Sequence, residues 1–169
     1  MSKITEMGSV VERAAKMLIE NKFSIAFAES ATAGRASAEF SMVCDAGKFL
    51  KGGMVCYDAE LKCSVLHVPH DLLQKYTPES MEVTAAIAKG LAGLIPADIH
   101  IGITGLPCSG GSETTGKPVG TMFLYSLFKG NELFAERVVF QGSHQEIVDQ
   151  TVQHVACLLI EHLGGNAFR

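Results

Sequence analysis

Residues 24–34 read Ser-Ile-Ala-Phe-Ala-Glu-Ser-Ala-Thr-Ala-Gly and contain the change of structure on which the fold depends. The first five form a short apolar run of the kind found in strands. The small and polar residues that follow predict a tight turn. Beyond the turn, Ala36, Phe40 and Val43 are spaced as on one face of a helix. The stretch therefore predicts a strand, a turn and a helix in succession.

The rest of the chain continues this alternation. Asp58 and Ser80 are good N-caps for two of the helices, and the Lys-Gly-Asn sequence at 129–131 predicts a hairpin turn. Apolar spacing predicts helices over residues 9–21, 58–66, 80–94 and 144–163, a short turn or helix at 69–73, and strands over 52–57, 98–104, 119–128 and 132–140. We therefore expect an α/β fold, a three-layer α/β/α sandwich with a mixed sheet.

The length and charge of the chain indicate a single domain and argue against nucleic-acid binding. The 169 residues suit one domain over 1–169. Fourteen Lys and Arg against eighteen Asp and Glu leave a net charge of −4, without the basic excess typical of nucleic-acid binding. No apolar stretch approaches the ~20 residues of a membrane span, and the first residues do not resemble a signal peptide. We expect a cytoplasmic protein without nucleic-acid or membrane partners.

Cysteine and histidine usage gives no sign of a metal site. The five cysteines include no C-x-x-C pair, and the six histidines form no ligand pattern. We expect no metal and no cofactor. The cysteines are predicted to be small buried hydrophobes, with Cys108 set apart because it lies in a glycine-rich loop.

The turn at residues 29–34 is the first segment that could carry chemistry. A serine between a strand and a helix projects from the carboxyl edge of the sheet, where helix N–H groups can hold an oxyanion or phosphate. The simpler interpretation of this segment alone is that Ser30 or Thr32 caps the helix.

Tyr57 and Lys62 form the second segment. Tyr57 closes a predicted strand and Lys62 lies early in the next helix, so both can face the same sheet edge as Ser30. A lysine whose neutral form is favoured by burial can take a proton from serine. Alternatively, Lys62 is a solvated residue paired with Asp58 at i, i+4.

The third segment is the loop at residues 105–118, which is rich in glycine and too long for a simple connection. Exposed backbone N–H groups in such loops can hold phosphate. The loop matches neither the P-loop pattern, because Pro118 follows Lys117, nor a dinucleotide-binding motif, because a strand follows it.

Together and in this order, the segments resemble the CinA C-terminal domain family, whose characterised members are nicotinamide-nucleotide amidases. The resemblance runs from about residue 10 to 163. Its most specific parts are residues 28–34, 52–69, 103–105 with 110–111, and 117–121.

The resemblance implies hydrolysis of the carboxamide of nicotinamide mononucleotide to nicotinic acid mononucleotide and ammonia, without a metal. Ser30 would be the nucleophile, Lys62 its base and Tyr57 an aid to proton transfer. The family also implies a homodimer or larger homo-oligomer. The residues implied in substrate binding are Thr32, Gly34, Thr104, Gly105, Gly110 and Gly111.

Three departures from the family pattern bear on the substrate. Ala33 stands where the family has glycine, the loop has a displaced proline and one glycine fewer, and His144 stands where an arginine is usual. We then expect phosphate to be held by glycine N–H groups, by a helix N-terminus, and by Arg35, Lys117 or His144. Two alternatives remain open: a catalytically impaired pyridine-nucleotide-binding or regulatory paralogue, and an amidase of altered specificity.

Overall fold

The computed structural model describes the backbone of residues 3–164 and the side chains of residues 10–164. Its strands are β1 (Ile25–Glu29), β2 (Leu50–Val55), β3 (Ile99–Gly105), β4 (Thr121–Phe128) and β5 (Asn131–Val139). Its helices are α1 (Lys3–Asn21), α2 (Arg35–Ser41), α3 (Ala59–Ser64), α4 (His70–Tyr76), α5 (Met81–Leu94) and α6 (His144–Leu163), with a 3-10 turn at Ala46–Lys48. None of the helices in this part of the chain is long and apolar enough to cross a membrane.

The five strands form one mixed sheet in the order β2-β1-β3-β4-β5. β1 is parallel to both of its neighbours, whereas β3, β4 and β5 pair antiparallel. The carboxyl ends of the three parallel strands therefore meet at one edge of the sheet. The segments that follow those ends are the three that the sequence marks as chemically interesting.

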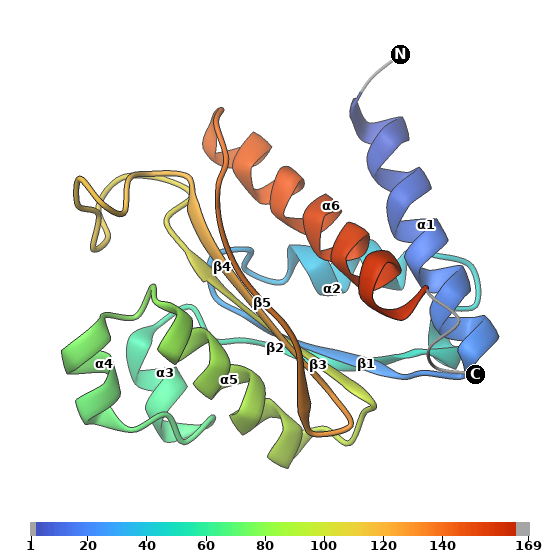
Figure 1. Cartoon of the computed structure of the whole chain (residues 1–169), viewed down its shortest axis with the longest axis horizontal. Coiled ribbons are helices and arrows are strands. Elements are labelled where there is room, and N and C mark those ends of the chain that lie inside the picture. The colour runs from blue at the N-terminus through green and yellow to red at the C-terminus, as the bar shows by residue number, and fades with distance from the viewer. Residues whose placement is uncertain (1–2, 165–169) are drawn as a thin grey trace.

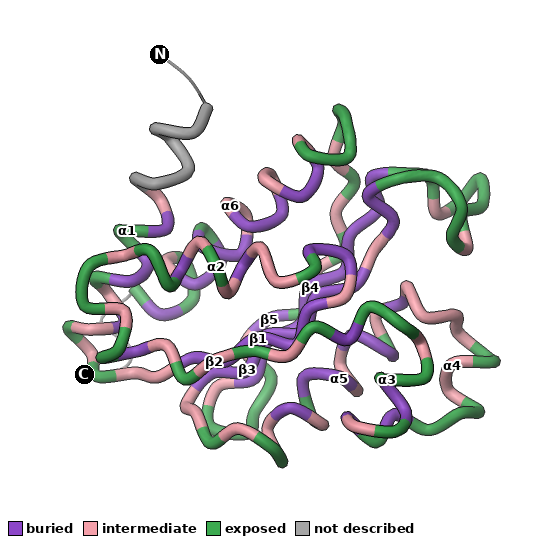
Figure 2. The backbone as a smooth tube through the Cα atoms, turned by 180° about the vertical axis from the view of Figure 1, so that it is seen from behind, coloured by how far each residue is buried: buried purple, intermediate pink, exposed green. Residues whose placement is uncertain are grey.

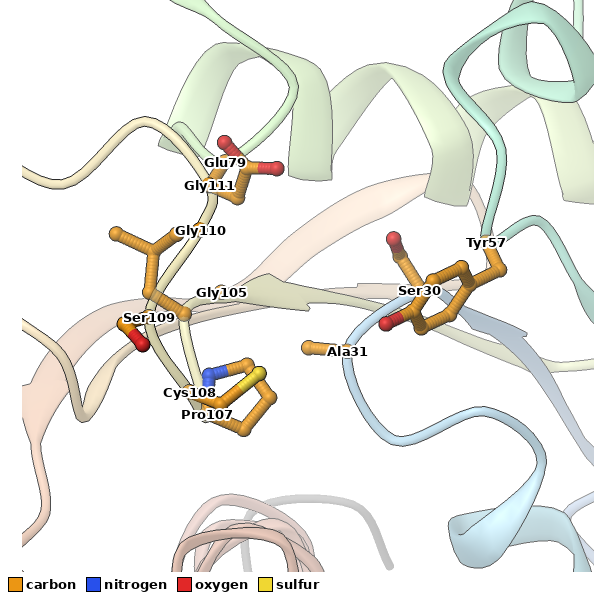
Figure 3. A pocket seen from close by; sticks show the side chains of 11 residues that line it. Ser30, Ala31, Tyr57, Glu79, Gly105, Pro107, Cys108, Ser109, Gly110 and Gly111 are labelled. Carbon is orange, nitrogen blue, oxygen red and sulfur yellow. The ribbon is translucent and has the colours of Figure 1, made fainter. Parts of the chain in front are cut away.

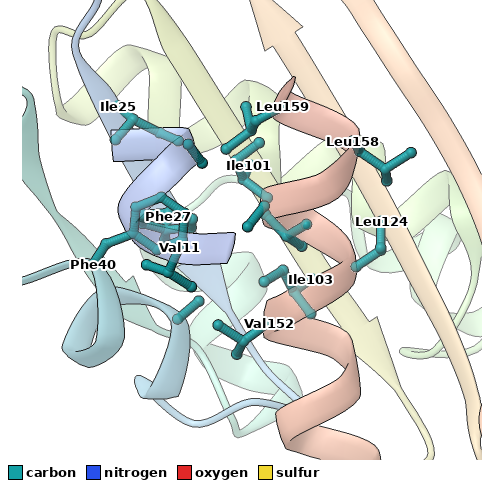
Figure 4. Close-up of a cluster of buried hydrophobic side chains, with 14 of the residues drawn as sticks. Val11, Ile25, Phe27, Phe40, Ile101, Ile103, Leu124, Val152, Leu158 and Leu159 are labelled. Carbon is teal, nitrogen blue, oxygen red and sulfur yellow. The ribbon is translucent and has the colours of Figure 1, made fainter. Parts of the chain in front are cut away.

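Helices cover both faces of the sheet, as predicted. Figure 1 shows α1, α2 and α6 on one face and α3, α4 and α5 on the other. The backbone of the central strands is buried between these layers (Figure 2). The larger apolar cluster lies under α1, α2 and α6 and includes Phe27, Ile101, Ile103, Leu124 and Val152 (Figure 4).

Several boundaries differ from the predicted ones. β2 ends at Val55 instead of residue 57, because the chain leaves the sheet once the Cys56 N–H has bonded to the Glu29 carbonyl at 2.7 Å. The hairpin turn uses Lys129 and Gly130, both at positive φ, so Asn131 already belongs to β5.

The prediction of buried cysteines is wrong for two of them. Cys56 and Cys63 are buried, but Cys44 and Cys157 are exposed. Cys157 lies on α6 away from the apolar face that Val152, Val155, Ala156 and Leu159 form, so helical spacing and not residue type decides its exposure. Cys108 is exposed as well.

A buried carboxylate holds the turn after β1. Glu29 is fully buried, and its Oε2 accepts hydrogen bonds from the Thr32 hydroxyl at 2.6 Å and from the N–H groups of Gly34 and Ala36 at 3.1 and 2.9 Å. Its Oε1 accepts from the N–H and hydroxyl of Ser37 at 2.8 and 2.6 Å. Glu29 thus satisfies the first N–H groups of α2, which would otherwise be unpaired.

The interpretation of Ser30 or Thr32 as the helix cap is therefore wrong. The N-cap residue of α2 is Gly34, at φ 94°, and no side chain at that position caps the helix. Thr32 donates to Glu29, and Ser30 is left free to face away from the helix. Ala33 adopts φ 47°, so the turn forms with alanine, at a cost of about 1–2 kcal/mol, at the position where the resemblance implies glycine.

Replacing Glu29 tests whether its carboxylate holds the turn after β1. Glu29→Gln replaces an acceptor oxygen by an NH₂ group that meets N–H donors, and we expect the free energy of unfolding to fall by about 2–4 kcal/mol. Glu39→Gln on the same helix breaks only the partly exposed pair with Arg35, which is worth at most about 1 kcal/mol. Urea denaturation measures both. Equal losses in the two variants would show that Glu29 does not hold the turn.

Candidate active site

Ser30 and Lys62 meet at the sheet edge where β1 and β2 end. The Nζ atom of Lys62 lies 3.0 Å from the Oγ of Ser30. Ser30 follows β1 directly, and its N–H donates to the carbonyl of Ile103 in β3 at 2.9 Å. Lys62 reaches the serine from α3, which Asp58 begins by accepting from the Glu60 N–H at 2.7 Å.

Lys62 is buried, with 1% of its surface exposed. Besides Ser30, its Nζ donates to the carbonyls of Cys56 at 2.8 Å and Tyr57 at 3.3 Å. As an ammonium, Nζ has three N–H donors for these three oxygens. As a neutral amine it has two N–H donors, which the two carbonyls can accept, and one lone pair, which can then accept from the serine hydroxyl. The alternative of a solvated Lys62 paired with Asp58 is wrong, because the side chain points into the protein.

The surroundings of Lys62 favour its neutral form. Burial lowers the pKa of Lys62 below 10.5. Electrostatic interactions with four neighbours act to raise this pKa, but their effect is smaller than that of burial; the four are Cys56, Glu79, Asp58 and Cys63. An ammonium group loses more hydration energy on burial than a neutral amine does. Lys62 can therefore act as a proton acceptor at a lower pH than an exposed lysine.

A pocket of about 220 Å³ opens in front of Ser30. Figure 3 shows Ser30, Ala31 and Tyr57 on one side of it and the glycine-rich loop on the other, with Glu79 beside Gly111. The pocket thus brings together five residues expected at the site. These are Ser30, Tyr57, Gly105, Gly110 and Gly111.

Tyr57 lines the pocket with its ring, and its side chain is not fixed there. The residue is 63% exposed. Its hydroxyl makes no hydrogen bond to any residue that the structure describes, Ser30 and Lys62 included. Only its backbone carbonyl contacts Lys62.

Three of the expected substrate-binding residues lie outside this lining. Thr104 is fully buried, and its hydroxyl lies 2.8 Å from that of Thr84, which in turn donates to the Ser80 carbonyl. Thr32 and Gly34 are occupied by Glu29. Thr32 also lines a second, shallower pocket of about 350 Å³ whose other residues are Ala31, Ala33, Arg35, His144, Gln145 and Val148.

The glycine-rich loop is fastened to the segment before α5. Lys117 Nζ lies 2.8 Å from the Thr77 hydroxyl, 2.9 Å from the Glu79 carbonyl and 2.7 Å from the Ser112 hydroxyl. The Ser112 hydroxyl donates to the Glu79 carboxylate. These contacts hold the loop wall of the pocket opposite Ser30.

Two groups expected to bind phosphate already have partners. Arg35 pairs with Glu39 at 2.7 Å and with Asp149 at 3.3 Å. In the loop, the N–H of Gly110 donates to the Glu113 carboxylate at 2.9 Å. Hydrogen bonds from the backbone of Gly110, Glu113 and Gly111 lower the pKa of Glu113 and keep it ionised.

No group of three His, Cys, Asp or Glu side chains within residues 10–164 is arranged to hold a metal ion. The chemistry available at the pocket is that of a serine hydroxyl beside a buried amine.

Sequence reasoning did not foresee the roles of Glu29 and Glu79. Glu29 had a detectable signal, because an ionisable residue ends an otherwise apolar strand directly before a turn. Glu79 had none, since its place in the pocket depends on how the segment before α5 packs against a loop some thirty residues later.

Comparisons with known proteins agree with this architecture. Residues 7–163 match the model of the CinA C-terminal domain. A CinA-like protein of Thermotoga neapolitana is 36% identical over 148 residues, which are 88% of this chain and 36% of that protein. A CinA-like protein of Dictyoglomus thermophilum is 33% identical over 82% of this chain and 33% of its own length. The chain spans about a third of the length of the curated relatives it matches.

A solved structure is similar over nearly the whole chain. The crystal structure of a competence-damaged protein (CinA) superfamily protein from Klebsiella pneumoniae superposes with a TM-score of 0.88 at 29% identity, covering 94% of this chain and 98% of that one. The fold, the motif order and the family model agree, and the chain belongs to the CinA C-terminal domain family.

Proposed function

We propose that this chain is a metal-independent amidohydrolase that acts on the carboxamide of nicotinamide mononucleotide or of a closely related pyridine nucleoside. One observation carries the proposal: the buried amine of Lys62 lies 3.0 Å from the hydroxyl of Ser30, which lines an open pocket. A serine needs such a partner to become a nucleophile. The compound class comes from the family resemblance.

In the first half of the proposed reaction, Ser30 Oγ attacks the amide carbon while its proton passes to the lone pair of Lys62. The resulting ammonium returns this proton to the amide nitrogen, so that ammonia leaves and an acyl-serine ester remains. The two carbonyls that hold Nζ keep the amine oriented through both transfers.

In the second half, a water molecule attacks the ester and gives its proton to Lys62. The proton then returns to Ser30 Oγ as the product leaves as a carboxylic acid. Water has been consumed and the enzyme is unchanged; the acid then gives its remaining proton to ammonia, so that carboxylate and ammonium result.

The negative oxygen of each tetrahedral intermediate needs N–H donors. The N–H of Ala31 meets this need best, because Ala31 adjoins Ser30 in the pocket lining and its N–H has no hydrogen-bond partner among the described residues. Glu29 supports this role by holding the turn rigid.

Replacing the nucleophile tests the proposal most directly. We expect Ser30→Ala to lower ammonia release from nicotinamide mononucleotide, nicotinamide riboside or nicotinamide by about a thousandfold or more. Ser64→Ala, which removes an exposed hydroxyl on α3, should leave the rate unchanged, as should a chelator. A wild-type chain inactive on all three amides, or an active Ser30→Ala, would refute the proposal and favour a binding paralogue.

The pH dependence tests Lys62 as the base. Because the neutral amine is the active form, kcat/KM should rise roughly tenfold per pH unit below the lowered pKa of Lys62 and level off above it. Lys62→Arg keeps a positive charge that does not titrate, and we expect it to be inactive at every pH. A rate that falls as pH rises, or an active Lys62→Arg, would contradict this role.

The Tyr57 hydroxyl is proposed to assist proton transfer once substrate has closed the pocket, since catalytic hydrogen bonds often form only in the complex. Tyr57→Phe retains the ring and removes the hydroxyl. We expect kcat to fall about a hundredfold with little change in KM. A Tyr57→Phe enzyme with wild-type kcat would limit Tyr57 to forming the pocket wall.

A further inference from the structure

The charge of the pocket lining is negative. Among the described residues that line it, Glu79 is the only one with a charged side chain. One of its carboxylate oxygens accepts from the Ser112 hydroxyl. The other, Oε1, has no hydrogen-bond partner in the described part of the chain. A carboxylate with an unoccupied oxygen therefore stands in the lining of the pocket that Ser30 and Tyr57 also line (Figure 3).

The cations near the pocket are already engaged. Lys117 is surrounded by three oxygen acceptors, and Arg35 pairs with two carboxylates. Lys62 is buried behind Ser30. None of the three lines the pocket, so none of them directly contacts an anionic group of a ligand bound there.

The glycine-rich loop carries an anion of its own. The Glu113 carboxylate accepts the Gly110 N–H at 2.9 Å, which is the type of donor that would otherwise hold a phosphate. A phosphate dianion held by the Gly110 N–H would have to displace the Glu113 carboxylate, and it would share the pocket lining with Glu79. Like charges in contact are strongly unfavourable.

From these contacts, and resting on the proposed amide hydrolysis, we propose that Glu79 is a specificity-determining residue that selects a cationic pyridinium carboxamide without a phosphate group. The ligand class is thus the nucleoside and not the nucleotide.

The chemistry of the ligand fits this assignment. A nicotinamide ring joined to a sugar through its nitrogen carries a positive charge, which the Glu79 carboxylate attracts and the electron-rich face of the Tyr57 ring can stabilise. Free nicotinamide is neutral and gains neither effect. The mononucleotide gains both but adds a dianion that the pocket does not neutralise.

Calorimetric titration of the full chain carrying Ser30→Ala measures binding without turnover. We expect nicotinamide riboside to bind about tenfold more tightly than nicotinamide mononucleotide, and also more tightly than nicotinamide. Adding Glu79→Gln should remove most of the preference for the riboside over nicotinamide, while Gln Oε1 still accepts from Ser112. Circular dichroism and thermal unfolding establish that each variant is folded.

Glu12→Gln is the matched control, because it changes the net charge by the same amount on α1, across the sheet from α3, α4 and α5 (Figure 1). It should leave all three affinities unchanged. The inference is overturned if the mononucleotide binds as tightly as the riboside, if Glu79→Gln retains the full preference, or if the riboside does not bind.

Turnover is measured separately on the wild-type chain. The expected binding preferences without ammonia release would refute the proposed function and support the ligand class. Ammonia release with a preference for the mononucleotide would support the proposed function and refute the ligand class.

Discussion

The burial of the Glu29 carboxylate is the constraint on which the site depends. A carboxyl group without exposure to water needs hydrogen-bond partners, and here the donors come from the turn and the first residues of α2. The same residue reaches the other half of the site through its backbone, because its carbonyl accepts the Cys56 N–H. The Cys56 carbonyl then orients Lys62. One residue therefore positions both the serine and the amine.

Lys62 is a second buried polar group, and the protein offsets the cost of burying its amine with hydrogen bonds. Its burial disfavours the charged form, while two backbone carbonyls satisfy its N–H groups and define where its lone pair points. Glu79, on the other side of the pocket, acts to raise the pKa of Lys62, whereas burial lowers it. The pocket thus lies beside an amine whose pKa burial lowers, and its lining includes the Glu79 carboxylate. That combination underlies the proposed preference for a cationic amide over a phosphate ester.

The fold was largely predictable, because hydrophobic periodicity and capping residues are local signals. Asp58 and Ser80 cap α3 and α5 as expected, and the layers and mixed sheet follow. At the site, Ser30, Tyr57 and the loop glycines converge as expected. Thr104 does not reach the pocket, because it lies inward from the loop and contacts Thr84. Alternation along a strand indicates which residues share a face but does not tell how deeply a side chain is covered.

The sequence by itself determined that strands alternate with helices, and that a serine turn, a tyrosine with a lysine, and a glycine-rich loop all follow strand ends. Parallel pairing then places these segments at one edge. Only the tertiary structure decided that Glu29 and not a hydroxyl caps α2, that Lys62 turns inward to Ser30, and that Glu79 faces the pocket while Glu113 occupies the loop N–H. The reason is physical: burial and hydrogen-bond partners come from residues distant in the chain, and these decide which charges are neutralised and which face a ligand.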